Sequence, residues 1–283
     1  MSSDMNRKKL DGQDLQLLEK KVEDAKKVIR DAFEKYGPET LRIAWTGGKD
    51  STLVLWLARE VCLEMGADLP KCFNINEGDM FNEIIEFIDT IKADWGAQIV
   101  HIHNDDVSKA AGGVLGAAVQ VEDLNERNRR EIERLGYEED EFDYEPESFV
   151  GNHLMKTVTM NKYLEDEQTA GIFIGVRWDE QEARSNEEYF NLHEATDYNP
   201  EHMRIHPILH FTEHDVWDAH FQYDIPICKL YLEGYRSLGA KVTTSKTSDA
   251  PAWEQDLDST YERGGRRQDK EELMAKLRKL GYM

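Results

Sequence analysis

The sequence predicts an α/β fold, a mostly parallel and doubly wound sheet with helices on both faces. Three observations predict it. Short apolar runs typical of buried strands recur along the chain, helical segments separate them, and the first run leads through a glycine-rich turn into a helix. Parallel strands need a long crossover connection between them, and this connection is usually a helix. Strands that alternate with helices are therefore expected to pair in parallel. Ligands of such sheets bind where the strands end at their carboxyl termini.

The N-terminal segment, residues 1–40, is predicted to contain a long helix over residues 13–36. Its apolar side chains recur at helical spacing, and Gly37 and Pro38 end the pattern. The apolar positions are Leu15, Leu17, Leu18, Val22, Ala25, Val28, Ile29, Ala32 and Phe33. We expect this helix to pack against the sheet or a partner, and core packing is the simpler interpretation.

The central segment, residues 41–220, is predicted to carry the sheet. Its expected strands are the apolar runs 41–45, 71–75, 98–103 and 171–175. A helix is expected to begin near Thr52, and another to cover residues 80–95. A chain of 283 residues that is 40% hydrophobic can bury one full core.

An acidic insertion, about residues 120–150, interrupts this pattern. Residues 122–135 are predicted to form a charged helix, and residues 136–147 mix carboxylates with aromatic side chains. The simpler interpretation is a solvated surface excursion, and the alternative is an element that docks a partner.

Residues 46–51, Thr-Gly-Gly-Lys-Asp-Ser, have the features of a phosphate-binding turn. Free backbone N–H groups and the positive end of the helix dipole converge where a strand passes through a short turn into a helix. Glycines allow a phosphate to approach the backbone, and the hydroxyls and Lys49 add donors. The spacing fits neither the Walker pattern nor the dinucleotide fingerprint. An ordinary glycine-rich turn is the alternative.

A second group of charged residues follows the predicted strand 171–175. It consists of Arg177, Asp179, Glu180 and Arg184. Arginine presents a planar fork of donors that suits phosphate or sulfate oxygens. A surface ion-pair network is an equally good interpretation of this composition alone.

The hexapeptide resembles the S-G-G-K-D-S signature of the PP-loop ATP pyrophosphatases, with Thr46 in the place of the first Ser. The resemblance implies an adenine nucleotide alpha-hydrolase-like fold. It also implies cleavage of ATP between its α- and β-phosphates while the loop holds the pyrophosphate portion. Residues 41–220 would then form the nucleotide-binding domain, and residues 221–283 a basic C-terminal segment that completes the site.

Later segments resemble the phosphoadenylyl-sulfate reductase and sulfate adenylyltransferase small-subunit branch. The stretch from Gly175 to Arg184 is similar to its G-x-R-x-D-E-x-x-x-R motif, and residues 262–269 are similar to its E-R-x-G-R-x-x-D motif. Thr212 is predicted to cap a helix with Asp215 at the capping-box position. Arg263 and Arg266 would fold over the nucleotide as a basic lid, with a flexible basic tail as the alternative.

The resemblance and the residues together predict the following site. Catalytic roles are expected for Lys49, Asp50, Arg177 and Arg184. Nucleotide contacts are expected for Thr46, Gly47, Gly48, Ser51, Gly175, Asp179, Arg263 and Arg266. The expected cofactors are ATP and Mg²⁺, with Asp50 as the candidate metal ligand.

Two departures from the family pattern qualify this prediction. No cysteine follows Cys228, which argues against the reductase reaction and against an iron–sulfur cluster, since both need cysteines. Asn76 stands where the family has an Asp, so one carboxylate of the family pattern is missing.

Three functions therefore remain open. In the first, sulfate attacks ATP to give adenylyl sulfate and pyrophosphate, with a GTPase large subunit as partner. In the second, the chain is the ATP pyrophosphatase of a DNA phosphorothioation system with a cysteine desulfurase, and Cys228 either receives sulfur or is a buried inert thiol. In the third, the chain is a catalytically silent nucleotide-binding subunit.

The composition limits the partners. A formal net charge of −22 disfavours direct, strong binding to nucleic acid or to anionic membranes. No apolar run reaches the ~18 residues of a membrane span, and the N-terminus lacks a signal-peptide core. Three scattered cysteines suggest a reducing cytoplasm. A homo-oligomer stays open.

Overall fold

The computed structural model describes residues 9–146, 148–181 and 184–265. Its six-stranded sheet has the order β3-β2-β1-β6-β8-β7. The strands are β1 (Leu41–Ala44), β2 (Lys71–Ile75), β3 (Ile99–Ile102), β6 (Gly171–Phe173), β7 (Phe190–His193) and β8 (His202–Ile205). All neighbouring strands pair in parallel except β7, which is antiparallel to β8. The predicted mostly parallel, doubly wound α/β fold is confirmed.

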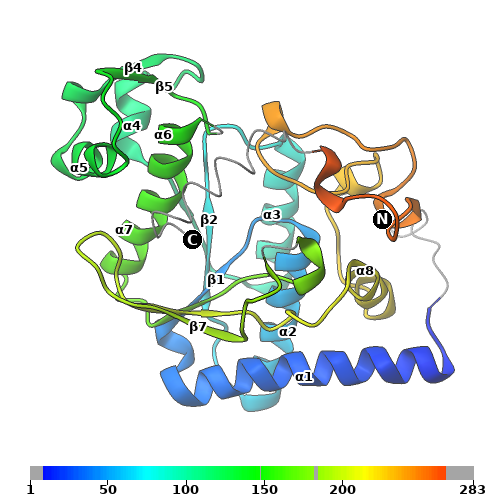
Figure 1. Ribbon diagram of the computed structural model, residues 1–283. Helices are drawn as coiled ribbons and strands as arrows, with labels where there is room; N and C mark the ends of the chain where they lie inside the picture. The colour runs from blue at the N-terminus through cyan, green and yellow to red at the C-terminus, as the bar shows by residue number, and fades with distance from the viewer. Residues whose placement is uncertain (1–8, 147, 182–183, 266–283) are drawn as a thin grey trace.

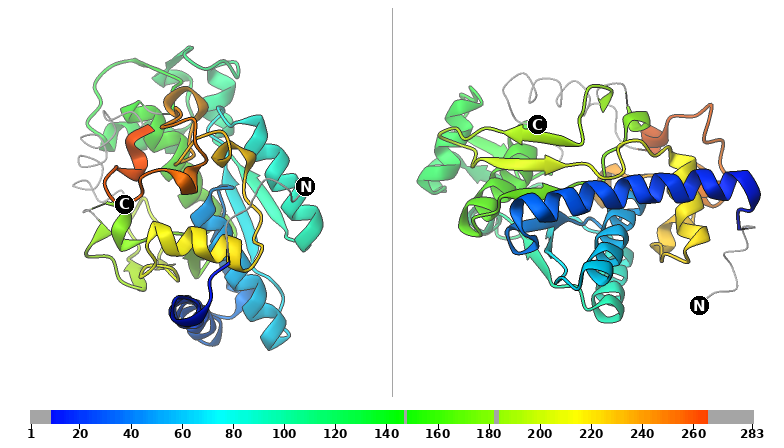
Figure 2. Two further views of the ribbon diagram at one scale, coloured as in Figure 1. Left: turned by 90° about the vertical axis from the view of Figure 1, so that its right-hand side faces the viewer. Right: turned by 90° about the horizontal axis from the view of Figure 1, so that it is seen from below.

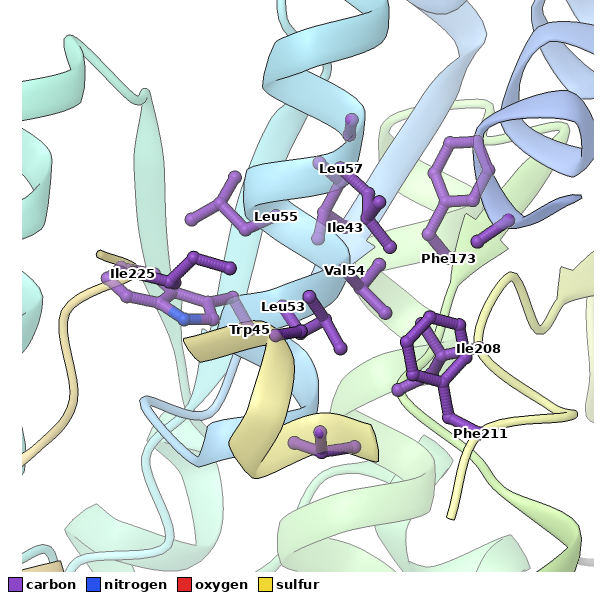
Figure 3. Packing of buried hydrophobic residues seen from close by; sticks show 14 of the residues in the cluster. Ile43, Trp45, Leu53, Val54, Leu55, Leu57, Phe173, Ile208, Phe211 and Ile225 are labelled. Carbon is purple, nitrogen blue, oxygen red and sulfur yellow. The ribbon is translucent and has the colours of Figure 1, made fainter. Parts of the chain in front are cut away.

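Four helices share one face of this sheet. They are α1 (Gly12–Tyr36), α2 (Lys49–Met65), α3 (Asn82–Trp95) and α8 (Glu213–Gln222). Buried side chains from all four join those of β1, β6 and β8 in the main hydrophobic core. Figure 3 shows Trp45, at the end of β1, and Ile43 beside the α2 side chains Leu53, Val54 and Leu57. The N-terminal helix is part of this core, and α1 packs across α2 and against α8 (Figures 1 and 2).

The opposite face is covered by α7 (Thr159–Asp166), which packs Tyr163 and Leu164 on Phe73 and Ile172. A lobe precedes α7, at the upper left of Figure 1. It contains α4 (Asp105–Ala110), β4 (Ala118–Gln120), α5 (Glu126–Arg134), β5 (Glu141–Asp143), α6 (Phe149–Asn152) and a π-helical segment (His153–Val158). The described chain after α8 contains short 3₁₀ segments at 229–231, 241–243, 252–254 and 262–265.

The acidic stretch is more than the solvated excursion that its charge predicts. Phe142 and Tyr144 are each only 5% exposed and belong to a second, smaller core in the lobe. Strand β5 pairs antiparallel with β4 and alternates exposed Glu141 and Asp143 with buried Phe142. The carboxylates face solvent while the aromatic side chains bury, so the composition alone conceals a strand.

Local signals explain several helix ends. Gly37 ends α1 with a positive φ of 76°, which glycine adopts without strain. At α8, Thr212 accepts a bond from the N–H of Asp215, and the Asp215 carboxylate accepts one from the N–H of Thr212. The predicted capping box is therefore confirmed. Among the described residues, no helix has both the length and the apolar character to cross a membrane.

Two histidines on β7 and β8, His193 and His202, are expected to make the folded protein less stable in acid. The rings of His193 and His202 stack with centroids 5.1 Å apart, and burial lowers the pKa of His193 to about 3 and that of His202 to about 4. Both stay neutral in the folded chain at pH values where the unfolded chain, with an ordinary pKa of 6.5, binds protons. The free energy of unfolding is thus expected to fall as the pH drops from about 6.5 to 4. Urea unfolding at a series of pH values measures it.

The variant His193→Gln is expected to flatten this pH dependence, because it removes one of the two groups. The exposed His103→Gln variant is the control and should retain the wild-type slope. If the free energy of unfolding of His193→Gln depended on pH as that of wild type does, His193 would not be a cause of the acid instability.

Candidate functional site

The candidate site lies where the strand order reverses. From β1 the chain moves through α2 to β2 on one side, whereas β6, the other neighbour of β1, leads to β8. The loops that follow β1 and β6 therefore separate at this point and leave a crevice at the carboxyl ends of the strands. Of the predicted residues, Thr46, Gly47 and Gly48 lie in the turn after β1, Lys49, Asp50 and Ser51 form the first turn of α2, and Gly175, Arg177, Asp179 and Glu180 follow β6.

The two loops touch through Gly175. A Cβ atom at this position would lie 2.9 Å from both the carbonyl carbon of Asp50 and the amide nitrogen of Ser51. No side chain fits at such a distance, so only glycine allows this approach. Gly175 thus fixes the position of the β6 loop against the first turn of α2.

The turn before α2 also depends on glycine. Gly47 has a φ of +77°, and a Cβ atom there would lie 2.9 Å from Ile84. The hydroxyls of Thr46 and Ser51 are 3.1 Å apart, and Gly48, the N-cap of the 17-residue helix α2, supplies no side-chain cap. The N-terminus of a long helix attracts anions through those N–H groups that remain free and through its dipole.

Lys49 lies differently from the sequence prediction. Its side chain is buried, and its Nζ donates to Oε1 of Glu262 at 2.5 Å and to the carbonyl of Arg236 at 3.2 Å. Its backbone N–H donates to the hydroxyl of Tyr231 at 2.8 Å. Burial opposes the charged form, but nearby carboxylates, led by Asp50, outweigh it and raise the pKa of Lys49. The ammonium is therefore held by carboxylates rather than left free for a phosphate.

Arg177 is held in the same way. The guanidinium is 1% exposed, and it donates to Asp50, to Asp179 at 2.8 Å from Nε, and to Glu262. Burial opposes the charge, and these carboxylates raise the pKa of Arg177 well above its ordinary value. Asp179 also accepts a bond of 2.7 Å from the N–H of Glu213, at the start of α8.

These contacts form one buried ionic network, which we call the Glu262 network. Its members are Lys49, Asp50, Arg177, Asp179, Glu213, Arg236 and Glu262. Burial alone would raise the pKa of Glu262, yet Lys49 and Arg177 lower it to about 2. The network joins the β1 loop, the β6 loop, α8 and the C-terminal segment, so it holds the walls of the site in register.

A cavity of about 390 Å³ is bordered by Thr46, in the turn that follows β1. Its apolar walls include Trp45, Phe73 and Leu238. Its cations are Lys156, Arg184 and Arg263. Apolar walls with a few cations suit a nucleotide, whose base is flat and whose phosphates are charged.

Each of these cations has an acidic partner. Lys156 pairs with Glu77 at 2.7 Å, Arg184 with Glu187 at 3.1 Å and Arg263 with Glu180 at 2.9 Å. Arg184 and Arg263 were predicted, whereas Lys156 was missed. Lys156 lies in the π-helical segment before α7 and reaches the cavity from the lobe. A π-helical segment often marks a functional site, but nothing in the local sequence signals it.

The remaining predicted residues divide as follows. The Asp50 side chain is 22% exposed, and the described residues contain no group of three or more His, Cys, Asp or Glu side chains placed to hold a metal. Asp50 would therefore offer Mg²⁺ one ligand, which suits an ion that takes most of its ligands from phosphates and water. Arg266 lies outside the described residues. Asn76 accepts a bond of 2.9 Å from the N–H of Gly78 and shapes the turn after β2.

The cysteines show no sign of reactivity. All three are buried, and burial raises the pKa of Cys62 and Cys228 to about 11 and that of Cys72 to about 12. Since the thiolate is the reactive form, the structure supports an inert thiol at Cys228.

Comparisons with known proteins agree with the fold. The profile of the phosphoadenosine phosphosulfate reductase domain matches residues 40–246. Sulfate adenylyltransferase subunit 2 of Brucella anthropi is 26% identical over 209 residues, which are 67% of this chain and 58% of that protein. A probable FAD synthase of Caenorhabditis briggsae is 26% identical over 229 residues, 80% of this chain and 34% of that protein. The chain thus spans less than two thirds of the length of these curated relatives.

Solved structures show the same fold. FMN adenylyltransferase of Candida glabrata, in complex with FMN and the ATP analog AMPCPP, superposes with a TM-score of 0.59 at 18% identity and covers 95% of this chain and 80% of its own. Phosphoadenylyl-sulfate reductase of Candida auris has a TM-score of 0.55 at 14% identity, and the match covers 84% of this chain and all of its own. With the profile matching most of the chain, the protein belongs to the phosphoadenosine phosphosulfate reductase domain family of the PP-loop superfamily.

Proposed function

We propose that this protein binds ATP in the 390 Å³ cavity and cleaves it between the α- and β-phosphates, transferring the adenylyl group to an anionic acceptor. The observation that carries the proposal is the close contact of Gly175 with the first turn of α2. This contact sets two loops around a helix N-terminus whose N-cap residue, Gly48, supplies no side-chain cap, in a chain of the PP-loop superfamily. Sulfate is the proposed acceptor.

In this mechanism the pyrophosphate portion lies on the turn of residues 46–48 and the N–H groups at the start of α2. Hydroxyls of Thr46 and Ser51 add donors. Arg184, Arg263 and Lys156 face the cavity and stabilise the negative charge that shifts to the leaving pyrophosphate and the attacking oxygen. Asp50 would hold Mg²⁺, whose positive charge would lower the repulsion between ATP and an incoming anion.

In this proposal Lys49 and Arg177 do not contact the reacting phosphates directly. Both cations are saturated by carboxylates of the Glu262 network, so we propose that they hold the turn and the β6 loop at a fixed spacing. Phosphoryl and adenylyl transfer depend mainly on such positioning, with the attacking and leaving oxygens in line.

FMN is the second candidate acceptor. The structure of Candida glabrata FMN adenylyltransferase covers 95% of this chain, and the Caenorhabditis briggsae probable FAD synthase aligns with 80% of it. Adenylyl transfer to FMN uses the same cleavage of ATP, with a phosphate oxygen as the attacking group. The name of the sulfate adenylyltransferase relatives, subunit 2, leads us to propose a partner subunit for the sulfate reaction.

Pyrophosphate release from ATP and Mg²⁺ tests the proposal. We expect pyrophosphate release that depends on added sulfate, with adenylyl sulfate as the product. Formation of FAD from FMN would instead identify FMN as the acceptor. Release that needs neither acceptor but increases with a cysteine desulfurase would favour the phosphorothioation role. Lys49→Ala, which removes the buried ammonium, serves as the inactive control. Binding of ATP without any turnover would reject the enzymatic proposal in favour of a silent nucleotide-binding subunit.

A further inference from the structure

Asn74 of β2 is a buried amide in the wall of the 390 Å³ cavity. Side chains alternate along a strand, and its neighbours Phe73 and Ile75 pack toward α7. Asn74 therefore points to the opposite face, where Trp45 and Ile84 belong to the main core. Both of these apolar residues also line the cavity. The amide thus stands in an apolar part of the wall.

One hydrogen bond fixes the orientation of this amide. The Nδ2 of Asn74 donates to the carbonyl oxygen of Trp45 at 3.0 Å. Turning the amide over would set Oδ1 against that carbonyl oxygen, and two acceptors repel each other. Nδ2 therefore stays on the Trp45 side, and Oδ1 is directed away from it.

The Oδ1 of Asn74 has no hydrogen-bond partner among the described residues. The residue is 4% exposed, so bulk water does not satisfy this oxygen either. Buried polar atoms are rarely left unpaired, and an unpaired one is unfavourable for the folded state. Because Asn74 lines a cavity of the size that binds small molecules, a ligand group with an N–H or O–H donor would supply the missing bond.

The cations of the cavity and this oxygen suit different parts of a nucleotide. Lys156, Arg184 and Arg263 attract phosphates, whereas Oδ1 of Asn74 is an acceptor and needs a donor. In ATP the donors are the ribose hydroxyls and the 6-amino group of adenine. Of these, the amino group is at the edge of a flat, largely apolar ring, and Asn74 stands among apolar side chains.

We infer that Asn74 selects the base of the nucleotide, because its Oδ1 accepts a hydrogen bond from the 6-amino group of adenine. Guanine carries a carbonyl oxygen at the same ring position, so it would set one acceptor against another. A site that hydrogen-bonds an N–H group of its ligand also rejects the analogue that lacks this group. The inference rests on the proposed function, since it needs the nucleotide in this cavity.

The test compares three triphosphates that differ at this ring position. ATP has an amino group there, GTP a carbonyl oxygen and purine riboside triphosphate a hydrogen atom. Their dissociation constants are measured by calorimetric titration of the full chain with Mg²⁺ and without an acceptor. We expect wild type to bind GTP and purine riboside triphosphate at least about tenfold more weakly than ATP. Equal affinity of wild type for ATP and purine riboside triphosphate would overturn the inference.

Asn74→Leu removes the acceptor and keeps a side chain of similar size. It also removes the bond to Trp45, but that loss affects the binding of all three nucleotides alike. The ratio of the affinities for ATP and purine riboside triphosphate should therefore fall to about one, as in a double-mutant cycle between Asn74 and the amino group. A ratio as large as that of wild type would show that adenine is recognised elsewhere.

Asn161→Leu is the matched control. The Oδ1 of Asn161 is also buried without a described partner, and its Nδ2 likewise donates to a backbone carbonyl, that of Tyr198, at 3.2 Å. Asn161 lines a different cavity, of about 500 Å³, at the β7–β8 edge of the sheet. This variant should keep the wild-type ratio. An equal loss of the ratio in both variants would mean that the fold, and not the contact with the base, causes it.

A contact with the ribose would give a different result. In that case 2′-deoxy-ATP or 3′-deoxy-ATP would bind wild type more weakly than ATP, purine riboside triphosphate would bind as ATP does, and the difference would vanish in Asn74→Leu. This result would overturn the assignment to the base.

Turnover separates the inference from the proposed function. Discrimination that depends on Asn74 in a chain without turnover would support the contact with the base and reject only the reaction. Turnover of ATP by a chain with equal affinity for ATP and purine riboside triphosphate would support the reaction and reject the contact. A chain that binds none of the three nucleotides would reject both.

Discussion

Replacing Glu262 with Ala is expected to lower the free energy of unfolding by about 3–5 kcal/mol, the usual cost of removing one partner from a buried ion pair. The substitution leaves two buried cations, Lys49 and Arg177, without the carboxylate that they share. Arg177 keeps Asp50 and Asp179, but Lys49 keeps only the carbonyl of Arg236 at 3.2 Å and two carboxylates at 3.6 Å. Urea unfolding at pH 7 measures the loss.

Nucleotide turnover should disappear in the same variant even at temperatures where it stays folded. Glu262 joins Lys49, in the first turn of α2, to Arg177 of the β6 loop. Without Glu262 the distance between these two segments is no longer fixed, and the position of the turn of residues 46–48 depends on it. Because the pKa of Glu262 is lowered to about 2 from an ordinary 4.5, its contribution is fully present above about pH 4.5 and is lost as the pH falls toward 2.

Glu86→Ala is the matched control for this prediction. Glu86 also pairs with a lysine at 2.8 Å, but both side chains are more than half exposed. Exposed pairs contribute about 0–1 kcal/mol, so this variant should unfold nearly as wild type does and keep its activity. A Glu262→Ala chain as stable and active as Glu86→Ala would show that the network is dispensable.

Gly175→Ala is expected to lower the turnover of ATP by about 100-fold, the effect that a displacement of about 1 Å has on a reaction that depends on positioning. The added Cβ would lie 2.9 Å from backbone atoms of Asp50 and Ser51, and backbone cannot rotate aside as a side chain does. The β6 loop and the start of α2 must then move apart. This movement displaces both Arg177 and the turn of residues 46–48.

Gly264→Ala is the control for this second prediction, because a Cβ atom there meets nothing within 4 Å. Steady-state pyrophosphate release and thermal unfolding are measured on both variants. Wild-type turnover in Gly175→Ala would mean that the reaction does not need the contact between the two loops, and would remove the main support for the proposed site.

The comparison of sequence and structure shows which signals are local. The strand at 71–75 and the capping box of Thr212 and Asp215 form as predicted, because each depends on side chains a few residues apart. Strands β7 and β8 were missed, and so was β5, where exposed carboxylates mask the alternation of a strand. The carboxylates around Lys49 were missed because Glu262 lies 213 residues away in the chain.

The sequence by itself determined the place of the site. A glycine-rich turn between a buried strand and a helix is a local pattern, and the alternation of strands and helices puts that turn at the edge of a parallel sheet. Only the tertiary structure decided what each charge does there. Lys49 and Arg177 look like phosphate ligands in the sequence, but folding buries them among carboxylates. The reason is physical, since the role of a cation depends on how far it is removed from water and on which distant residues come within reach.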